Sequence, residues 1–129
     1  MIYLDICESE DNITLSGSII TSPGYPTENY PNYKTCEKVI RLEEGKSIRI
    51  RFLDNFEIES HSSCNYDFIE IINGTTYNSP SIGKFCGSTK PQPIIIHEGT
   101  IRIKFRSDSS VNKKGFAMKI SQIALGEGN

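Results

Sequence analysis

The chain has 129 residues, a length typical of one domain that buries its own hydrophobic core. Its formal net charge of −2 argues against a nucleic-acid-binding protein, because such proteins carry a basic surface. The longest apolar run, at 93–96, is the size of a strand and falls far short of the roughly 18 residues of a membrane helix. We therefore expect one globular domain with no nucleic-acid partner and no membrane span in this fragment.

Apolar and polar residues alternate with a period of two along most of the chain, which predicts β-strands with one buried and one solvent-facing side. The expected strands are, in chain order, 39–42, 47–53, 68–72, 101–105 and 115–120. Turn sequences such as 43–46 and Asn73-Gly74 separate them. No window of helical length shows the apolar period of an amphipathic helix. The sequence therefore predicts an all-β protein, an antiparallel sandwich or barrel.

Four cysteines are spread along the chain without the C-x-x-C spacing of zinc or redox sites: Cys7, Cys36, Cys64 and Cys86. Their even number favours two disulfide bonds and an extracellular location, although four cysteines permit three different pairings. Glycosylation sequons at Asn12 and Asn73 add modest support for a secreted glycoprotein. Residues 1–5 carry no secretory signal, so a secreted parent would be represented by a mature fragment.

Acidic residues lie at the ends of three strand-like segments. These segments are Phe56-Glu57-Ile58-Glu59, Cys64-Asn65-Tyr66-Asp67 and Phe105-Arg106-Ser107-Asp108-Ser109-Ser110. Carboxylates on separate segments are what a cation site built from loops needs, and calcium prefers such hard oxygen ligands. Acidic residues are otherwise most often solvated loop residues. Together with the cysteines, the pattern indicates a calcium-dependent recognition module rather than an enzyme.

In this order the segments closely resemble a CUB domain, an extracellular module of complement proteases, tolloid-type metalloproteases, neuropilins and spermadhesins. The resemblance runs from Cys7 to about Ile120, and its further motifs are Ser22-Pro23-Gly24-Tyr25-Pro26, Tyr30-Pro31, Gly83-Lys84-Phe85-Cys86-Gly87 and Gly115-Phe116. It implies a jelly-roll-like sandwich of two antiparallel sheets with disulfides Cys7–Cys36 and Cys64–Cys86. The expected domain is 7–123, with an N-terminal extension at 1–6 and a linker stub at 124–129.

The resemblance also implies a site for Ca²⁺. Its carboxylate ligands would be Glu59, Asp67 and Asp108, while Ser110 and Val111 occupy positions that contribute backbone or water-mediated oxygens. Tyr30 matches the tyrosine whose hydroxyl steadies the acidic cluster from the opposite loop. A lone histidine, His61, lies near Glu59 but lacks the further nitrogen or sulfur ligands of a zinc site.

One residue departs from the family pattern. Family members usually carry tryptophan two residues after the second cysteine, and here that position is Lys38. Alternation with Ile40 and Leu42 places Lys38 on the inward side of its strand. Either its stem lies along the edge of the core with the amine in water, or the strand begins one residue later.

The expected function is recognition of a protein outside the cell. Calcium would hold the loops and leave the carboxylates of Glu59 and Asp67, with the Tyr30 hydroxyl, facing solvent. Such an acidic pocket suits a lysine or arginine side chain of a partner, and other modules of the same mosaic protein would be further partners. No catalytic residue is expected, because His61 and His97 have no serine or cysteine partner and the cysteines are structural.

An alternative function is calcium-independent recognition of a growth factor, guidance ligand or glycan through a sheet face. Another is positioning of substrate within a larger secreted protease. Arg49, Arg51, Arg102 and Lys104 alternate with apolar residues and could together form a basic face for sulfated glycans. Basic residues in this pattern are more often only solubilising.

Overall fold

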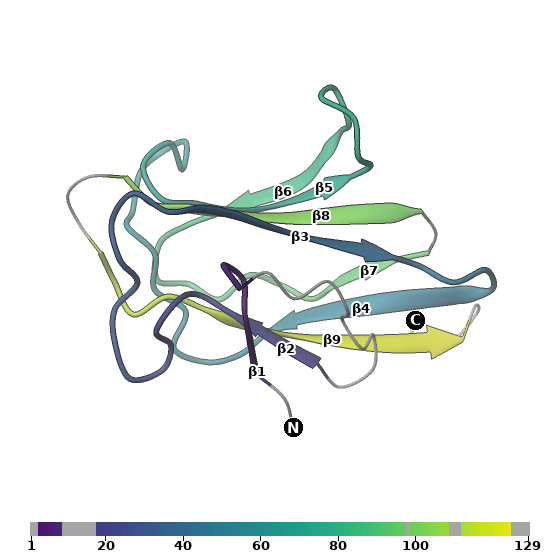
Figure 1. Ribbon diagram of the computed structural model, residues 1–129, viewed down its shortest axis with the longest axis horizontal. Coiled ribbons are helices and arrows are strands. Elements are labelled where there is room, and N and C mark those ends of the chain that lie inside the picture. Colours follow the sequence, from purple (N-terminus) through teal and green to yellow (C-terminus); the bar gives the residue numbers. More distant parts are fainter. Residues whose placement is uncertain (1–2, 9–17, 98, 109–111, 125–129) are drawn as a thin grey trace.

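Two β-sheets pack face to face as the two layers of a sandwich in the computed structural model, which describes residues 3–8, 18–97, 99–108 and 112–124 (Figure 1). The five-stranded sheet has the spatial order β1 (Tyr3–Asp5), β2 (Ser18–Thr21), β9 (Ala117–Ala124), β4 (Lys46–Phe52) and β7 (Ile94–Ile96). The four-stranded sheet has the order β3 (Thr35–Arg41), β8 (Thr100–Arg106), β5 (Phe68–Asn73) and β6 (Ser81–Phe85). The predicted all-β sandwich of two sheets is confirmed.

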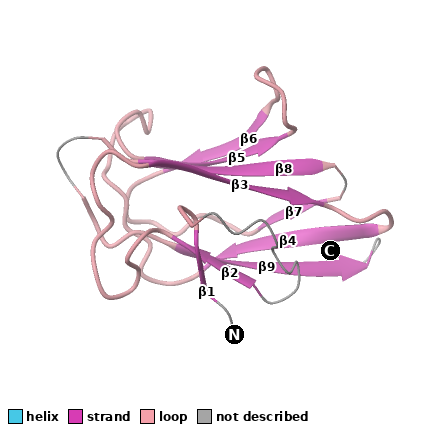
Figure 2. Cartoon of the chain, viewed as in Figure 1, coloured by secondary structure: helices cyan, strands magenta, loops and turns pink. Residues whose placement is uncertain are grey.

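Strand pairing is antiparallel throughout both sheets except between β1 and β2, which run parallel. Only strands, turns and loops occur in the described residues (Figure 2). Accordingly, no helix among those residues is long and apolar enough to cross a membrane.

The hydrophobic core lies between the inner faces of the two sheets. Every second residue of β4 and of β8 is buried there, because successive side chains of a strand point to opposite faces. These inward residues are Ile48, Ile50 and Phe52 on β4 and Ile101, Ile103 and Phe105 on β8. Burying each such side chain contributes about 1.5–3 kcal/mol to folding. The alternation in the sequence is therefore the alternation of core and surface.

Four strands lie outside the segments predicted as strands; one of them, β7, coincides with the strand-sized apolar run at 93–96. β2 is buried along its whole length, so it shows no alternation of polar and apolar residues. β1 lies in the segment expected to be an N-terminal extension, yet it pairs with β2, and Ile6 beyond it joins the core. β6 is short and mostly exposed, with Gly83 at its centre.

Two disulfide bonds tie loops to strands. One joins Cys7 to Cys36 near the start of β3, and the other joins Cys64, in the loop before β5, to Cys86 just after β6. This is the pairing that the resemblance implies. The second bond holds the loop that leads into Asp67 against the edge of the four-stranded sheet.

Lys38 points inward, as alternation along its strand predicts. Only 4% of the residue is exposed, and its Nζ donates a hydrogen bond to the backbone carbonyl of Glu8. The strand begins before Lys38, at Thr35, which excludes the later start. The stem therefore points inward, as the first alternative expects, but the amine does not reach water and instead donates to a carbonyl of the N-terminal segment.

The four alternating basic residues do not form one face, contrary to the expectation for glycan binding. Arg49 and Arg51 lie on β4 of the five-stranded sheet, whereas Arg102 and Lys104 lie on β8 of the four-stranded sheet. Each pair alternates with core residues, so the two pairs lie on opposite outer surfaces of the sandwich. Alternation in a sequence reports which side of a strand is buried, but it does not report which sheet the strand joins.

Candidate metal site

Three carboxylates from distant segments meet at one end of the sandwich. Glu59 follows the isolated bridge at Ile58, Asp67 immediately precedes β5, and Asp108 lies two residues after β8. One oxygen of each carboxylate lies within 4.8 Å of the others. The structure therefore brings together the three acidic residues that the sequence singles out.

Asp67 is at the centre of this cluster and is fully buried. Its Oδ2 accepts a hydrogen bond from the Tyr30 hydroxyl at 2.6 Å, and its Oδ1 accepts one from the backbone N–H of Asp108 at 2.7 Å. Hydrogen bonds to a charged acceptor are short and strong, and both of these distances are short. Asp67 thus joins the Tyr30 loop to the loop after β8.

Tyr30 is also fully buried, with its ring packed edge-on against Phe105 at a centroid distance of 5.1 Å. Its hydroxyl oxygen accepts a hydrogen bond from the Glu59 N–H at 3.1 Å while donating to Asp67. Burial and the bond to Asp67 raise the pKa of Tyr30, so the hydroxyl keeps its proton. The expectation that Tyr30 and Asp67 face solvent is wrong, because the two groups form the buried base of the cluster.

A second set of hydrogen bonds fixes the position of Asp108, and the sequence gives no signal for it. The Ser107 hydroxyl donates to the Pro31 carbonyl at 2.7 Å and accepts from the Lys34 N–H at 2.9 Å. The Tyr33 N–H donates to the backbone carbonyl of Asp108 at 3.0 Å. Serine and proline in such a loop read as ordinary turn residues, so only the folded structure shows that they dock the two loops together.

The cluster has an excess of negative charge. Burial, followed by the charges of Asp108 and Asp67, raises the pKa of Glu59, although Lys113 acts in the opposite direction. Burial also raises the pKa of Asp67, against the lowering effect of its hydrogen bonds from Tyr30 and Asp108. The buried Glu59 Oε1 has no hydrogen-bond partner. Buried polar atoms are rarely left in this state, so the arrangement fits a cation better than it fits the protein alone.

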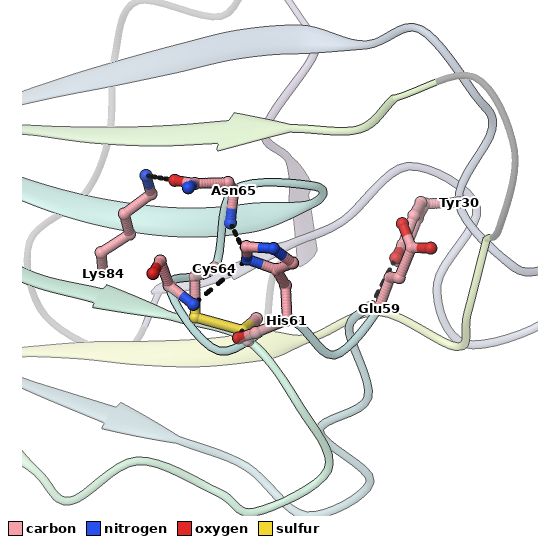
Figure 3. The surroundings of a disulfide bond; sticks show 8 residues. Tyr30, Glu59, His61, Cys64, Asn65 and Lys84 are labelled. Atoms are coloured by element: carbon pink, nitrogen blue, oxygen red, sulfur yellow. Dashed lines mark hydrogen bonds between the residues drawn. A yellow bond between two sulfur atoms is a disulfide. The ribbon is translucent and has the colours of Figure 1, made fainter.

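His61 shapes the loop between Glu59 and Asp67. Its Nδ1 accepts hydrogen bonds from the N–H groups of Ser63 and Asn65, at 3.1 and 3.2 Å, and its ring packs against Tyr66. In Figure 3 the His61 ring lies beside the disulfide of Cys64, away from Tyr30 and Glu59. The metal-ligand cluster found among the described residues does not include His61. Its ring nitrogen instead serves the turn that positions the loop.

Three of the predicted site residues, Ser110, Val111 and Asn12, lie outside the described residues. Asn73 is exposed at the end of β5, some six residues along the strand from Asp67. A glycan at Asn73 would therefore lie at the opposite end of the sandwich from the acidic cluster.

Replacing Tyr30 by phenylalanine is expected to lower the free energy of unfolding by about 1–3 kcal/mol, measured by urea denaturation in chelator. The ring and its packing remain, but Asp67 loses a donor and the partly buried Glu59 N–H loses its acceptor. Tyr25→Phe is the matched control, because the Tyr25 hydroxyl makes only a long, exposed bond of 3.5 Å to the Asp54 carbonyl. Equal losses in the two variants would contradict a buried structural role for the Tyr30 hydroxyl.

The fold and the cluster together define a disulfide-bonded β-sandwich module with a candidate metal site at one end. A family model described as "CUB domain" matches residues 7–120. The chain therefore belongs to the CUB family, and it is a single CUB domain, a non-catalytic module. The resemblance of its motifs to a CUB domain is thus confirmed.

Similar proteins carry this module as a small part of their length. The chain is 42% identical over 116 residues to human Tolloid-like protein 1, and this match covers 90% of the chain and 11% of that protein. It is 42% identical over 101 residues to rat Neuropilin-2, and this match covers 78% of the chain and 11% of that protein. The chain thus spans about a tenth of the length of these relatives.

Solved structures show the same fold. The CUB1-EGF-CUB2 domain of human MASP-1/3 superposes with a TM-score of 0.77 at 34% identity, covering 91% of this chain and 42% of that one. The MASP-1 CUB2 domain bound to Ca²⁺ superposes with a TM-score of 0.71 at 36% identity, covering 92% of this chain and 95% of that one.

Proposed function

We propose that this CUB domain is an extracellular protein-binding module in which one calcium ion, held by Glu59, Asp67 and Asp108, organises an acidic site for a basic side chain of a partner protein. The observation that carries the proposal is the convergence of three carboxylates, with ligand oxygens within 4.8 Å, from three separate loops. A CUB domain of similar fold that is bound to Ca²⁺ supports the choice of ion.

The residues present fit calcium. Carboxylate oxygens are the ligands that this ion prefers, and the partnerless Glu59 Oε1 is a buried oxygen available to it. A bound cation would supply positive charge that offsets the repulsion within the cluster. Ser110 and Val111, expected to contribute further oxygens, remain part of the proposal.

The partner contact is proposed at the accessible rim of the cluster rather than at its base. Glu59 and Asp108 are partly exposed, whereas Asp67 and Tyr30 are buried. The buried pair therefore holds the geometry by its hydrogen bonds, and the rim carboxylates offer charge to a lysine or arginine. Partial burial would make such an ion pair worth more than a fully exposed one, which contributes about 0–1 kcal/mol.

The domain is further proposed to belong to an extracellular protein built from several modules. Its two disulfides suit an oxidising compartment. In its relatives the matched module spans about a tenth of the length, which suits a parent protein with other modules. The domain would then position a partner for activities carried elsewhere in that parent.

Nα-acetyl-lysine methylamide is expected to shift the backbone NMR signals of residues around Glu59 and Asp108 when calcium is present. A neutral norleucine analogue of similar length should leave these signals in place, since it lacks the ammonium group. Asp108→Asn should lose the response, whereas Glu70→Gln, which removes a carboxylate from strand β5, should retain it.

Equal shifts in chelator and in calcium would contradict the role of the ion. Equal shifts with lysine and norleucine would contradict the recognition of charge. No shift at all would argue that the site is structural.

A further inference from the structure

A cluster of three basic residues occupies the outer face of the five-stranded sheet, and we call Arg49, Arg51 and Lys119 the basic patch. Arg49 and Arg51 alternate with core residues of β4, and Lys119 lies between the buried Met118 and Ile120 of β9. Arg51 and Lys119 are direct cross-strand partners. Their Cβ atoms are therefore about 5 Å apart on one face, and Arg49 follows about 7 Å along the strand.

The patch is not neutralised by its neighbours. The residues that pair with it on adjacent strands are Ser121, Ile95 and Ile19, all uncharged. Neither ion pair found among the described residues includes a member of the patch. The nearest acidic residue of the same sheet is Asp5 on the β1 edge, whose Oδ1 accepts a hydrogen bond from the Cys7 N–H.

The outer face of the four-stranded sheet is built differently. Lys104 there has Glu37 on one side and Glu70 on the other as cross-strand partners. Arg102 forms an ion pair with Glu37 at 3.1 Å. Arg102 and Lys104 on that face thus have acidic partners within the sheet. Like charges placed directly opposite each other destabilise a sheet, so the unbalanced Arg51–Lys119 pair has no structural benefit that would explain it.

The basic patch continues into an open hollow at the end of β4. Arg51 and Lys90 both line this hollow, which has a volume of about 560 Å³, and Lys90 forms an ion pair with Asp54 at 3.1 Å. Positive charge therefore extends beyond the sheet face, with one carboxylate opposing it at that end.

We propose that the basic patch binds a sulfated polysaccharide, independently of the calcium site. β4 and β9 are inner strands whose backbone groups already pair within the sheet, so a peptide cannot add to them as a further strand. Recognition at this face rests on side-chain charge, which complements a ligand carrying closely spaced, permanently ionised sulfate groups. The patch has cations rather than apolar anchors at its centre, which favours a polysaccharide over an acidic polypeptide.

The test is retention of the chain on immobilised heparin, eluted by a salt gradient. A triple variant, Arg49→Thr, Arg51→Thr and Lys119→Thr, is expected to bind heparin more weakly by a factor of about ten or more. Three exposed ion pairs between the chain and heparin are lost. Its melting temperature should stay the same or rise, since the like-charge pair is removed and threonine suits a strand. Retention of the wild-type chain should be unchanged in chelator. The Asp108→Asn variant should be retained as strongly as the wild-type chain.

A charge-matched control removes three cations from the other outer face through Arg41→Thr, Lys84→Thr and Lys104→Thr. This control should elute with the wild-type chain. If it elutes as early as the patch variant, only net charge matters and the assignment to this face is overturned. Displacement by polyglutamate as readily as by soluble heparin would overturn the choice of a polysaccharide, and displacement by desulfated heparin would overturn the role of sulfate.

Discussion

The chain in calcium at 100 times its dissociation constant is expected to melt roughly 10 °C higher than in chelator, and Asp67→Ala is expected to abolish this increment. Binding at that excess stabilises a folded state by about 2.7 kcal/mol. For a domain of this size, each kcal/mol raises the melting temperature by several degrees. Asp67 supplies a carboxylate to the cluster and also fixes Asp108 and Tyr30 through its two oxygens. Its loss removes one ligand and loosens the placement of another. Differential scanning calorimetry in calcium and in chelator measures the increment.

Two further variants separate ion binding from folding. Asp67→Ala should also melt lower in chelator, because the buried Tyr30 hydroxyl and the partly buried Asp108 N–H lose their acceptor. The increment rather than the absolute temperature is therefore the relevant quantity. Asp108→Asn removes charge but keeps the backbone N–H that donates to Asp67, and it should lose most of the increment with a smaller change in chelator. Glu70→Gln should keep the full increment. A wild-type chain that melts equally in both conditions would show that the cluster does not bind calcium.

Removing either disulfide as a pair of alanines is expected to lower the free energy of unfolding by about 3.5 kcal/mol, but only one removal should weaken calcium binding. The sequence separations of 29 and 22 residues give similar chain-entropy contributions for the two bonds. Cys64–Cys86 additionally anchors the loop between Glu59 and Asp67. Cys64→Ala with Cys86→Ala should therefore weaken calcium binding, whereas Cys7→Ala with Cys36→Ala should leave it nearly unchanged.

Urea denaturation and calcium titration calorimetry on the two double variants provide the comparison. The Cys7–Cys36 bond lies near β1 and β3, so it serves as the matched control of similar loop length. Equal losses of calcium affinity in both variants would contradict a specific role for the Cys64 loop.

The parts of the fold that could be predicted from the sequence are those in which one local rule determines the outcome. β4 and β8 alternate strictly, because one side of each strand meets the core and the other meets water. β2 is buried on both sides, so alternation carries no information about it. The separation of Arg49 from Arg102 onto opposite surfaces depends on how strands pair across the chain, which no local pattern reports.

The candidate site could be predicted as a set of residues but not as an arrangement. The motifs that resemble a CUB domain single out Glu59, Asp67 and Asp108, and these three do converge. The burial of Tyr30 could not be inferred, because its neighbours in the sequence are polar or proline and its environment comes from Phe105 on a distant strand. The docking of the Tyr30 loop through Ser107 depends likewise on contacts between segments far apart in the chain.

The position of Lys38 bears on whether copies of this domain aggregate through an exposed strand edge. Strand β3 is an edge of its sheet within the described part of the chain, and with seven residues it is the longest such edge. A long, regular edge invites a strand from another copy to add to it. An inward-pointing lysine is one of the devices that discourage this addition, and here its ammonium group is committed to the Glu8 carbonyl. An inward lysine at this edge is therefore expected to oppose edge-to-edge pairing between copies of the domain.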